Sequence, residues 1–381
     1  MTGLKIFWCS TSSGDVWNIM SSLDYLGQRE VRRFHYDQRW HEQSSQACMT
    51  NPQLRQALHA GGWRVLGWPR ERVAMDADMI RHAENYAPDL IIFTSAWEGL
   101  FCPLNETLTA LNKIAPVVHM LHDGSDSPWW SQLHQFEADN CFHTTVNIDG
   151  GMMWPGGRDW VSQVQTDDPA YPAVPTMQNV VGPVIKGFSL LTPVDPRPYG
   201  DRFIPHSERM YPIGYAGNSG GTIRGYMVQM LGRAIPSLVV RPREETPPTY
   251  QGYADLLKAC RIVVNVPFSG SNTAKHVKGR VVETGFAGTC LMEWQNDATR
   301  AWFQPRHDYW EYSGSGMWEA IQDCIESAQF LMARPKLAEE IAYEHWRKVR
   351  SEHSPEVFWG KVFSAAGVPK AAEQALDAAA E

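Results

Sequence analysis

The chain has 381 residues, 43% of them hydrophobic and 20% charged, and its 34 Lys and Arg against 42 Asp and Glu give a net charge of -8. This length predicts about two domains, and the apolar content excludes intrinsic disorder. The negative charge excludes a surface that is basic throughout, as bulk nucleic-acid binding would require.

Local patterns exclude further classes of protein. No apolar run approaches the roughly 18 residues that would span a bilayer, and residues 1–10 have the pattern of a strand rather than of a secretory signal peptide. The seven Cys are scattered and form no Cys-x-x-Cys pair, so neither a disulfide framework nor a zinc site is predicted. We therefore expect a soluble, cytoplasmic protein.

Short apolar runs alternate with helical stretches in the first half of the chain. Continuous apolar strands separated by helices are typical of a parallel sheet covered on both faces. The first half therefore predicts a Rossmann-like α/β domain. Strands are expected at residues 4–9, 90–94 and 117–121, with a weaker one at 64–67, and helices are expected before Gly27 and at 80–86 and 108–114.

Residues 150–210 are rich in Pro and Gly and show little periodicity, so we expect a linker near residues 192–206. The alternation then restarts, which predicts a second domain of the same class. Its strands are expected at 212–215, 238–241, 262–266 and 290–293, and its helices at 223–231, 253–259, 280–286, 317–332 and 337–350.

The predicted fold class is α/β, with two Rossmann-like domains that face one another across a cleft. Ligands bind at the carboxyl ends of the strands in such folds. A helix after Ser354 is expected to return to the first domain, because Phe358, Trp359 and Phe363 need a core. The expected first domain, second domain and returning helix are residues 1–195, 196–355 and 356–381.

A glycine-rich turn follows the strand expected at 212–215. Gly217 and Asn218 lie in this turn, and the first turn of the next helix holds Arg224. Converging N–H groups at a helix N-terminus bind phosphate, and an Arg adds a bidentate donor. The turn has neither the P-loop pattern nor the dinucleotide fingerprint, so a flexible turn before a helix is the alternative.

A second cationic motif opens the helix expected at 280–286. Lys278 and Arg280 at its start suit a diphosphate, and Glu283, one turn later, can accept hydrogen bonds from both hydroxyls of a ribose. The alternative is a surface salt-bridge cluster. That alternative explains poorly why Glu283 lies among apolar neighbours.

These residues carry a resemblance to a known family. The stretches 278–283, 288–293 and 337–359 resemble the C-terminal nucleotide-sugar domain of two-lobed, GT-B type glycosyltransferases. The pattern is similar to that of the spore-maturation CgeB-like family, which has Lys-Gly-Arg-Val-Phe-Glu, a small-residue turn and Leu-Leu-Glu. The order of the parts is also similar to that of bacteriophage DNA β-glucosyltransferases.

The resemblance implies roles for the candidate residues. The first domain would bind the acceptor and the second the nucleotide sugar, with Arg224 and Arg280 on phosphate and Glu283 on the ribose. An Asp after a middle strand would be the catalytic base, and Asp123 is the candidate position. Arg, Lys and helix N-termini would neutralise the leaving diphosphate, so we expect a nucleotide-diphosphate sugar as donor and no metal or other cofactor.

One position departs from the family. Many retaining enzymes with this architecture carry a second Glu eight residues before the position of Glu283, where this chain has Lys275. We therefore favour an inverting reaction, and retention stays open.

The end of the strand at 117–121 supplies candidates for a general base. His122 and Asp123 follow this strand directly. An inverting sugar transfer needs one carboxylate or imidazole to take the acceptor proton. The alternative is an Asx turn that closes the strand.

Arginine and tryptophan residues gather between residues 29 and 72. Arg32, Arg33 and Trp40 are the acceptor-side candidates among them, as part of a surface for a polyanion. The alternative is solvated surface, which charge runs usually form.

Metal ligands are not predicted. Asp76 and Asp78 form an Asp-x-Asp pair, but no hydrophobic strand precedes it, so we expect these residues to cap the following helix. The 13 His form no His-x-x-x-His pair on one helix face.

The resemblance implies a glycosyltransferase of the hexosyltransferase type, which moves a sugar from a nucleotide-diphosphate sugar, with UDP favoured, to a hydroxyl acceptor. A glycan or small hydroxyl compound is the expected acceptor, and a 5-hydroxymethylpyrimidine base in phage DNA is the alternative. A non-catalytic, two-lobed ligand-binding protein is the alternative from another class. A dinucleotide oxidoreductase is disfavoured, because residues 11–14 lack Gly-x-Gly-x-x-Gly.

Overall fold

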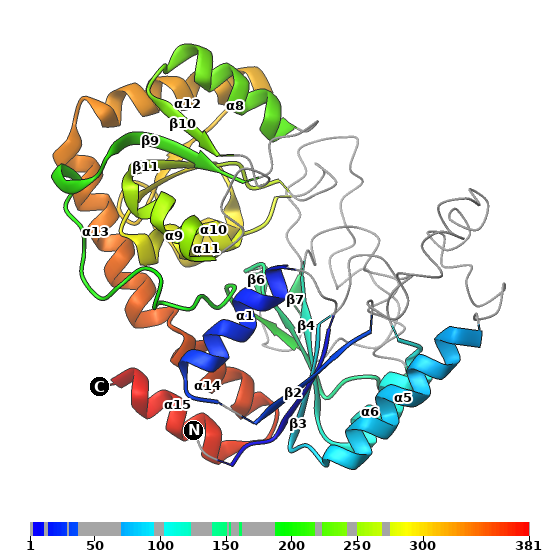
Figure 1. Ribbon diagram of the computed structural model, residues 1–381. Helices are drawn as coiled ribbons and strands as arrows, with labels where there is room; N and C mark the ends of the chain where they lie inside the picture. The colour runs from blue at the N-terminus through cyan, green and yellow to red at the C-terminus, as the bar shows by residue number, and fades with distance from the viewer. Residues whose placement is uncertain are drawn as a thin grey trace.

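The computed structural model describes residues 3–10, 14–28, 30–36, 70–94, 103–122, 139–150, 152–153, 160–161, 187–217, 223–241, 250–268 and 275–380. Two parallel β-sheets lie within these ranges, and helices cover both faces of each (Figure 1). No helix within these ranges is long and apolar enough to span a membrane.

The first sheet has six described strands, all parallel, in the order β2-β1-β3-β4-β5-β8. Alternate side chains point to opposite faces, so Ile6 and Trp8 enter one hydrophobic core and Phe7 and Cys9 enter the other. The strands are β1 (Ile6–Ser10), β2 (Val31–His35), β3 (Leu90–Thr94), β4 (Val117–Leu121), β5 (Thr144–Asn147) and β8 (Gly187–Ser189).

Helices from both ends of the sequence cover the first sheet. Each buries an apolar stripe against the strands, which leaves its polar face to solvent. One face is covered by α1 (Gly14–Tyr25), α14 (Pro355–Ala365) and α15 (Pro369–Ala380), and the other by α5 (Arg70–Tyr86) and α6 (Asn105–Ile114).

The second sheet has five described strands, all parallel, in the order β10-β9-β11-β12-β13. The strands are β9 (Tyr211–Ala216), β10 (Leu238–Arg241), β11 (Cys260–Asn265), β12 (Cys290–Trp294) and β13 (Trp310–Tyr312). Its helices are α8 (Ile223–Ala234) and α12 (Met317–Met332) on one face, α9 (Tyr250–Ala259) and α10 (Gly279–Ala287) on the other, and α13 (Pro335–Glu352), which contributes to both cores.

The remaining described elements are short. They are the two-stranded ribbon β6 (Met152–Met153) and β7 (Trp160–Val161), the 3-10 turn η2 (His206–Glu208) and the helix α11 (Asp297–Trp302).

The two doubly wound sheets confirm the expected α/β class. The structure also confirms the expected bounds of β3, β4, β10 and α12, whereas the periodicity does not predict β2, β5, β8 or β13 of the two sheets. The strand expected at 64–67 lies outside the described residues.

Both sheets share one strand order. In each, the first strand along the chain lies between the second and the third, so the winding direction reverses there. The reversal falls between β1 and β3 in the first sheet and between β9 and β11 in the second. Ligands of doubly wound sheets bind outside the carboxyl ends of the strands at this switch point. The ends of β9 and β11 are therefore the place to look for a site.

A chain segment and direct contacts join the two domains. Residues 190–210 connect β8 to β9, and Asp149, just after β5, accepts a backbone hydrogen bond from Val277 N at 3.0 Å. Trp302 Nε1 donates to Gly150 O at 2.8 Å. Gly150 has a φ of 65°, and a Cβ there would overlap the side chain of Val277. The carboxyl end of β5 therefore lies against the residues that precede α10.

Helix α14 completes one core of the first domain. Trp359 is fully buried, its ring centroid lies 6.0 Å from that of Trp8, and its Nε1 donates to Ser22 Oγ at 2.9 Å. Phe358 and Phe363 enter the same core. Figure 1 shows α14 and α15 in red next to α1 in blue. The last part of the chain thus packs against its first strand and helix.

We expect Trp359→Ala to lower the free energy of unfolding by about 3–5 kcal/mol, the usual range when a buried aromatic side chain is removed and a cavity remains. Chemical denaturation followed by circular dichroism measures the loss. Trp318→Ala is the matched control, because Trp318 is 57% exposed and surface substitutions change stability by about 0.5 kcal/mol or less. Equal losses in the two variants would contradict the role of α14 in the core.

Candidate functional site

Arg280 lies at the carboxyl ends of β9 and β11. Its helix, α10, begins at Gly279, directly after the N-cap residue Lys278. The Nη1 atom donates to Asn265 Oδ1 at 2.8 Å, and the guanidinium carbon lies 5.2 Å from the ring centroid of Tyr215. Asn265 is the last residue of β11, and Tyr215 lies near the end of β9. The structure therefore places a cation at the switch point of the second sheet.

The backbone of Gly217 lies directly against this cation. Gly217 has a φ of 134°, which L side chains rarely adopt, and a Cβ there would overlap Nη2 of Arg280. Glycine therefore allows the guanidinium to approach the turn that follows β9. The turn continues into Asn218, which lies outside the described residues.

Tyr253, on α9, joins Arg280 to Glu283. Its hydroxyl donates to Glu283 Oε2 at 3.0 Å and accepts a hydrogen bond from Arg280 Nε at 3.3 Å. Burial, together with the neighbouring Glu283 carboxylate, raises the pKa of Tyr253 well above its usual value. The phenol therefore keeps its proton and remains a donor to Glu283.

Asn265 joins Arg280 to a second acid. Asn265 Nδ2 donates to Glu293 Oε1 at 3.2 Å, and both side chains are fully buried. Burial raises the pKa of Glu293 to about 8, so the protonated acid predominates at neutral pH. We call the five hydrogen-bonded residues Glu283, Tyr253, Arg280, Asn265 and Glu293 the Arg280 network.

The sequence alone indicates Arg280 and Glu283 as site residues but not Tyr253 or Asn265. The first two belong to one contiguous motif, whereas the others come from different elements. Asn265 does carry a readable signal, since it is a polar residue near the end of an apolar run. No comparable signal marks Tyr253.

Arg209 fixes the two helices that carry the Arg280 network. Its Nη1 donates to Lys258 O and Cys260 O, both at 3.0 Å, at the end of α9, and its Nη2 donates to Ala287 O at 2.9 Å, at the end of α10. A cation at helix C-termini is favourable both for the helix dipole and for the last carbonyl groups. Burial lowers the pKa of Arg209 to about 10, so it stays charged at neutral pH.

Two further cations lie at helix N-termini on the same edge of the sheet. Lys278 is the N-cap of α10, and Arg224 lies in the first turn of α8. Arg224 Nε is buried and has no hydrogen-bond partner among the described residues. Helix N-termini and guanidinium groups both favour an anion. This edge of the second sheet is thus suited to a diphosphate.

One of the two base candidates, His122, lies at the carboxyl end of β4 in the first domain. His122 follows this strand and is half-buried, and its Nε2 has no hydrogen-bond partner among the described residues. Asp123 lies outside those residues. His119, inside β4, is stacked 4.4 Å from the ring of Phe142. Burial and the nearby His122 lower the pKa of His119 to about 3, so it is neutral.

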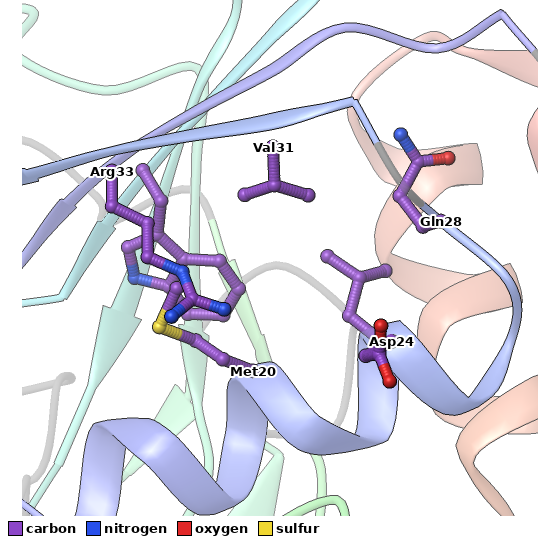
Figure 2. Close-up of a pocket in the computed structure, with 7 residues that line it drawn as sticks. Met20, Asp24, Gln28, Val31 and Arg33 are labelled. Carbon is purple, nitrogen blue, oxygen red and sulfur yellow. The ribbon is translucent and has the colours of Figure 1, made fainter.

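The structure describes two of the three acceptor-side candidates, Arg32 and Arg33. Arg32 and Arg33 are neighbours on the edge strand β2, so their side chains point to opposite faces of the sheet. The Arg32 guanidinium lies 4.4 Å from the ring centroid of Tyr86 on α5. Arg33 faces Asp24 of α1 across a pocket of about 150 Å³ (Figure 2). Trp40 lies outside the described residues.

The pocket in Figure 2 is separate from the Arg280 network. Met20 and Val31 belong to its apolar lining, and the charged side chains of Asp24 and Arg33 lie on different sides of it. Burial lowers the pKa of Arg33, and the Asp24 carboxylate partly offsets this shift. The lining residues are Trp8, Met20, Leu23, Asp24, Gln28, Val31 and Arg33.

The described residues contain no group of three or more His, Cys, Asp or Glu that is arranged to hold a metal ion. Asp76 and Asp78 lie inside α5 rather than before it, which corrects the expected cap. Asp76 Oδ2 accepts a hydrogen bond from Leu104 N at 3.1 Å, and Asp78 pairs with Arg81. Both carboxylates therefore have local structural partners.

Comparisons with known proteins identify the fold. The family model described as "Glycosyl transferase-like" matches residues 223–361. HepE of Anabaena, crystallised with UDP and glucose, is similar at a TM-score of 0.58 and 11% identity, over 96% of this chain and 100% of that chain. The fold is that of the GT-B glycosyltransferases.

Two other solved structures agree. A glycosyltransferase from Rickettsia africae has a TM-score of 0.57 at 8% identity, over 96% of this chain and 98% of its own. Sucrose-phosphate synthase from Thermosynechococcus elongatus has a TM-score of 0.55 at 9% identity, over 95% of this chain and 98% of its own. The search of curated proteins finds no match.

The glycosyl transferase-like segment contains most of the donor-site candidates. Arg224, Lys278, Arg280 and Glu283 lie within residues 223–361, whereas Gly217 and Asn218 precede them. The narrower resemblance to the CgeB-like family and to phage DNA β-glucosyltransferases stays a prediction.

Buried Glu293 makes the stability of the protein depend on pH. The pKa of Glu293 is about 8 in the folded protein and about 4.3 in an unfolded chain. Between these values the native state holds a proton that the unfolded state releases, so stability falls as the pH rises through this window. Glu293→Gln removes the effect and should therefore raise the melting temperature more at pH 9 than at pH 5. A difference that is the same at both pH values would contradict the raised pKa.

Proposed function

We propose that this protein is a glycosyltransferase that moves a sugar from a UDP-sugar to a hydroxyl acceptor. The observation that carries the proposal is the Arg280 guanidinium at the carboxyl ends of β9 and β11, inside the segment that matches a glycosyl transferase-like family. The UDP and glucose bound by HepE support the choice of a uridine donor.

The donor diphosphate binds at the cationic edge of the second sheet in this proposal. Arg280 uses Nε and Nη1 for Tyr253 and Asn265, which leaves Nη2, next to Gly217, for a phosphate oxygen. Lys278 and Arg224 bind the diphosphate from the N-termini of α10 and α8. These cations neutralise the charge that develops on the leaving diphosphate, so the reaction needs no metal ion.

The donor ribose lies on Glu283. Its carboxylate is held on one side by the Tyr253 hydroxyl and accepts hydrogen bonds from the two ribose hydroxyls. A carboxylate that accepts from vicinal hydroxyls distinguishes a nucleoside from a free diphosphate. The proposed donor is thus recognised at both its ribose and its diphosphate.

The acceptor hydroxyl attacks the anomeric carbon from the side of the first domain. The bond from that carbon to the diphosphate oxygen breaks, the electron pair leaves with UDP, and the acceptor proton passes to a base on the protein. Asp123 and His122 are the proposed bases, because both directly follow β4 in the sequence. Attack opposite the leaving group gives inversion.

A glycan or another hydroxyl compound is the proposed acceptor. Arg32 and Arg33, two residues of the arginine and tryptophan patch that favoured a DNA acceptor, point to opposite faces of β2, and Arg32 lies over the ring of Tyr86. Release of UDP when the protein is mixed with UDP-glucose tests catalysis against the alternative of a ligand-binding protein. A pure binding protein would release none.

Arg280→Ala should weaken UDP binding by about tenfold or more, because a hydrogen bond to a charged group contributes about 1.5–3 kcal/mol. Uridine should bind this variant as it binds wild type, since uridine has no diphosphate. Glu283→Ala should weaken UDP and uridine equally. Isothermal titration calorimetry measures the affinities of both variants for UDP and for uridine, relative to those of wild type.

Arg347→Ala is the control for these variants, because Arg347 is exposed on α13 and pairs with Glu344. It should bind both ligands as wild type does. If Arg280→Ala kept wild-type affinity for UDP, the assignment of the diphosphate site would be wrong.

Asp123→Asn should lower turnover by about 10²–10⁴ if Asp123 is the base, while UDP affinity stays unchanged. If His122→Ala loses activity instead, the imidazole is the base. The anomeric configuration of the product, measured by NMR, provides the second check. Two active variants and a product of retained configuration would contradict the inverting mechanism.

A further inference from the structure

We propose that Glu293 is a positioning residue for the donor diphosphate, which acts by holding the Asn265 side-chain amide in the orientation that presents Oδ1 to Arg280. The inference rests on the proposed function. It adds a residue that touches neither the ribose nor the phosphates.

Neighbouring strands bring Glu293 and Asn265 together. Asn265 ends β11, and Glu293 is its register partner on the parallel strand β12. The hydroxyl of Tyr312 donates to Asn265 O at 2.9 Å, which fixes the backbone there. The side-chain amide is then bound at both ends, with Oδ1 on Arg280 Nη1 at 2.8 Å and Nδ2 on Glu293 Oε1 at 3.2 Å.

A side-chain amide has a donor end and an acceptor end, so its orientation matters here. If the Asn265 amide turned over, its NH2 group would meet the Arg280 guanidinium, and two donors would face each other. Oε1 of the protonated acid accepts from Nδ2, which places the acid proton on Oε2, so the turned amide oxygen would meet the carbonyl oxygen Oε1 and two acceptors would face each other. Without Glu293, only Arg280 selects the orientation. With Glu293, the amide is already oriented when the guanidinium takes up a phosphate.

The position of Arg280 depends on this amide. Its Nε donates to Tyr253, and its Nη1 donates to Asn265, so two hydrogen bonds hold the guanidinium plane in place. Loss of one of these hydrogen bonds allows the guanidinium to rotate away from Gly217 and from the diphosphate. Groups held within about 0.5 Å by a supporting shell bind more tightly than loosely held ones.

A buried carboxyl group at this position carries an unfavourable desolvation free energy. Glu293 is fully buried on a strand between apolar neighbours, where an apolar side chain would avoid the desolvation penalty. Burial keeps the acid mainly protonated near neutral pH, since its pKa is about 8. Glutamine has the shape and the acceptor oxygen of that protonated acid, so Glu293→Gln is the conservative variant.

The test compares dissociation constants for UDP and uridine. Glu293→Met keeps a long buried side chain but removes the acceptor, and it should weaken UDP binding by about tenfold with uridine affinity unchanged. Glu293→Gln should restore UDP affinity to within about threefold of wild type. A role in folding alone would not move the ratio of the two constants.

Met292→Leu is the matched control for disturbance of the core. Met292 is fully buried on the same strand and points to the opposite face, toward α8 and α12. Its ratio of UDP to uridine affinity should equal that of wild type. If Met292→Leu lowered the ratio as Glu293→Met does, the positioning role would be overturned.

Asn265→Leu removes the hydrogen bond between Asn265 and Glu293 by changing the other partner. It replaces Glu293→Met in the test if circular dichroism shows that Glu293→Met does not fold. It should lower the ratio about tenfold, and the Glu293→Met, Asn265→Leu double variant should be no worse than Asn265→Leu alone. A wild-type ratio in Asn265→Leu, or additive losses in the double variant, would overturn the inference. If Arg280→Ala bound UDP as tightly as wild type, the proposed function itself would be wrong.

Discussion

The arrangement of the second domain depends on where one half-buried positive charge, that of Arg280, is held. Among the described residues, the Arg280 guanidinium donates hydrogen bonds to Tyr253 and Asn265, which are both neutral. The acids Glu283 and Glu293 accept hydrogen bonds from these two partners. Burial lowers the pKa of Arg280, but the nearby Tyr253, Tyr215 and Glu283 side chains outweigh this effect and raise the pKa above its usual value. The packing of the surrounding helices and strands holds these side chains around the guanidinium.

That packing fixes α9 and α10 at both ends. Their carboxyl ends meet on Arg209, and their side of the sheet is closed by α13, where a Cβ at Gly285 would overlap Val349. The start of α10 lies against the first domain through the contacts of Gly150 with Val277 and Trp302. The residues of the proposed donor site are therefore tied to the neighbouring domain.

The sequence predicts those parts of the structure that depend on residues close to one another along the chain. Apolar runs such as 90–94 and 117–121 give strands, and the contiguous motif at 278–283 gives the cation and one acid of the site. The strand β5 is missed because it is short and largely polar, with the sequence Thr-Thr-Val-Asn, and β13 is missed because Trp-Glu-Tyr is too short to show a period. Tyr253 and Arg209 are missed because their partners lie on other elements, so only the tertiary structure reveals their roles.

The most direct test of the central claim is a crystal structure of this protein with UDP. The diphosphate should lie outside the carboxyl ends of β9 and β11, with a phosphate oxygen within hydrogen-bond distance of Arg280 Nη2 and the ribose hydroxyls on Glu283. UDP bound elsewhere, such as in the pocket lined by Asp24 and Arg33, or at these strand ends with Arg280 turned away, would contradict it.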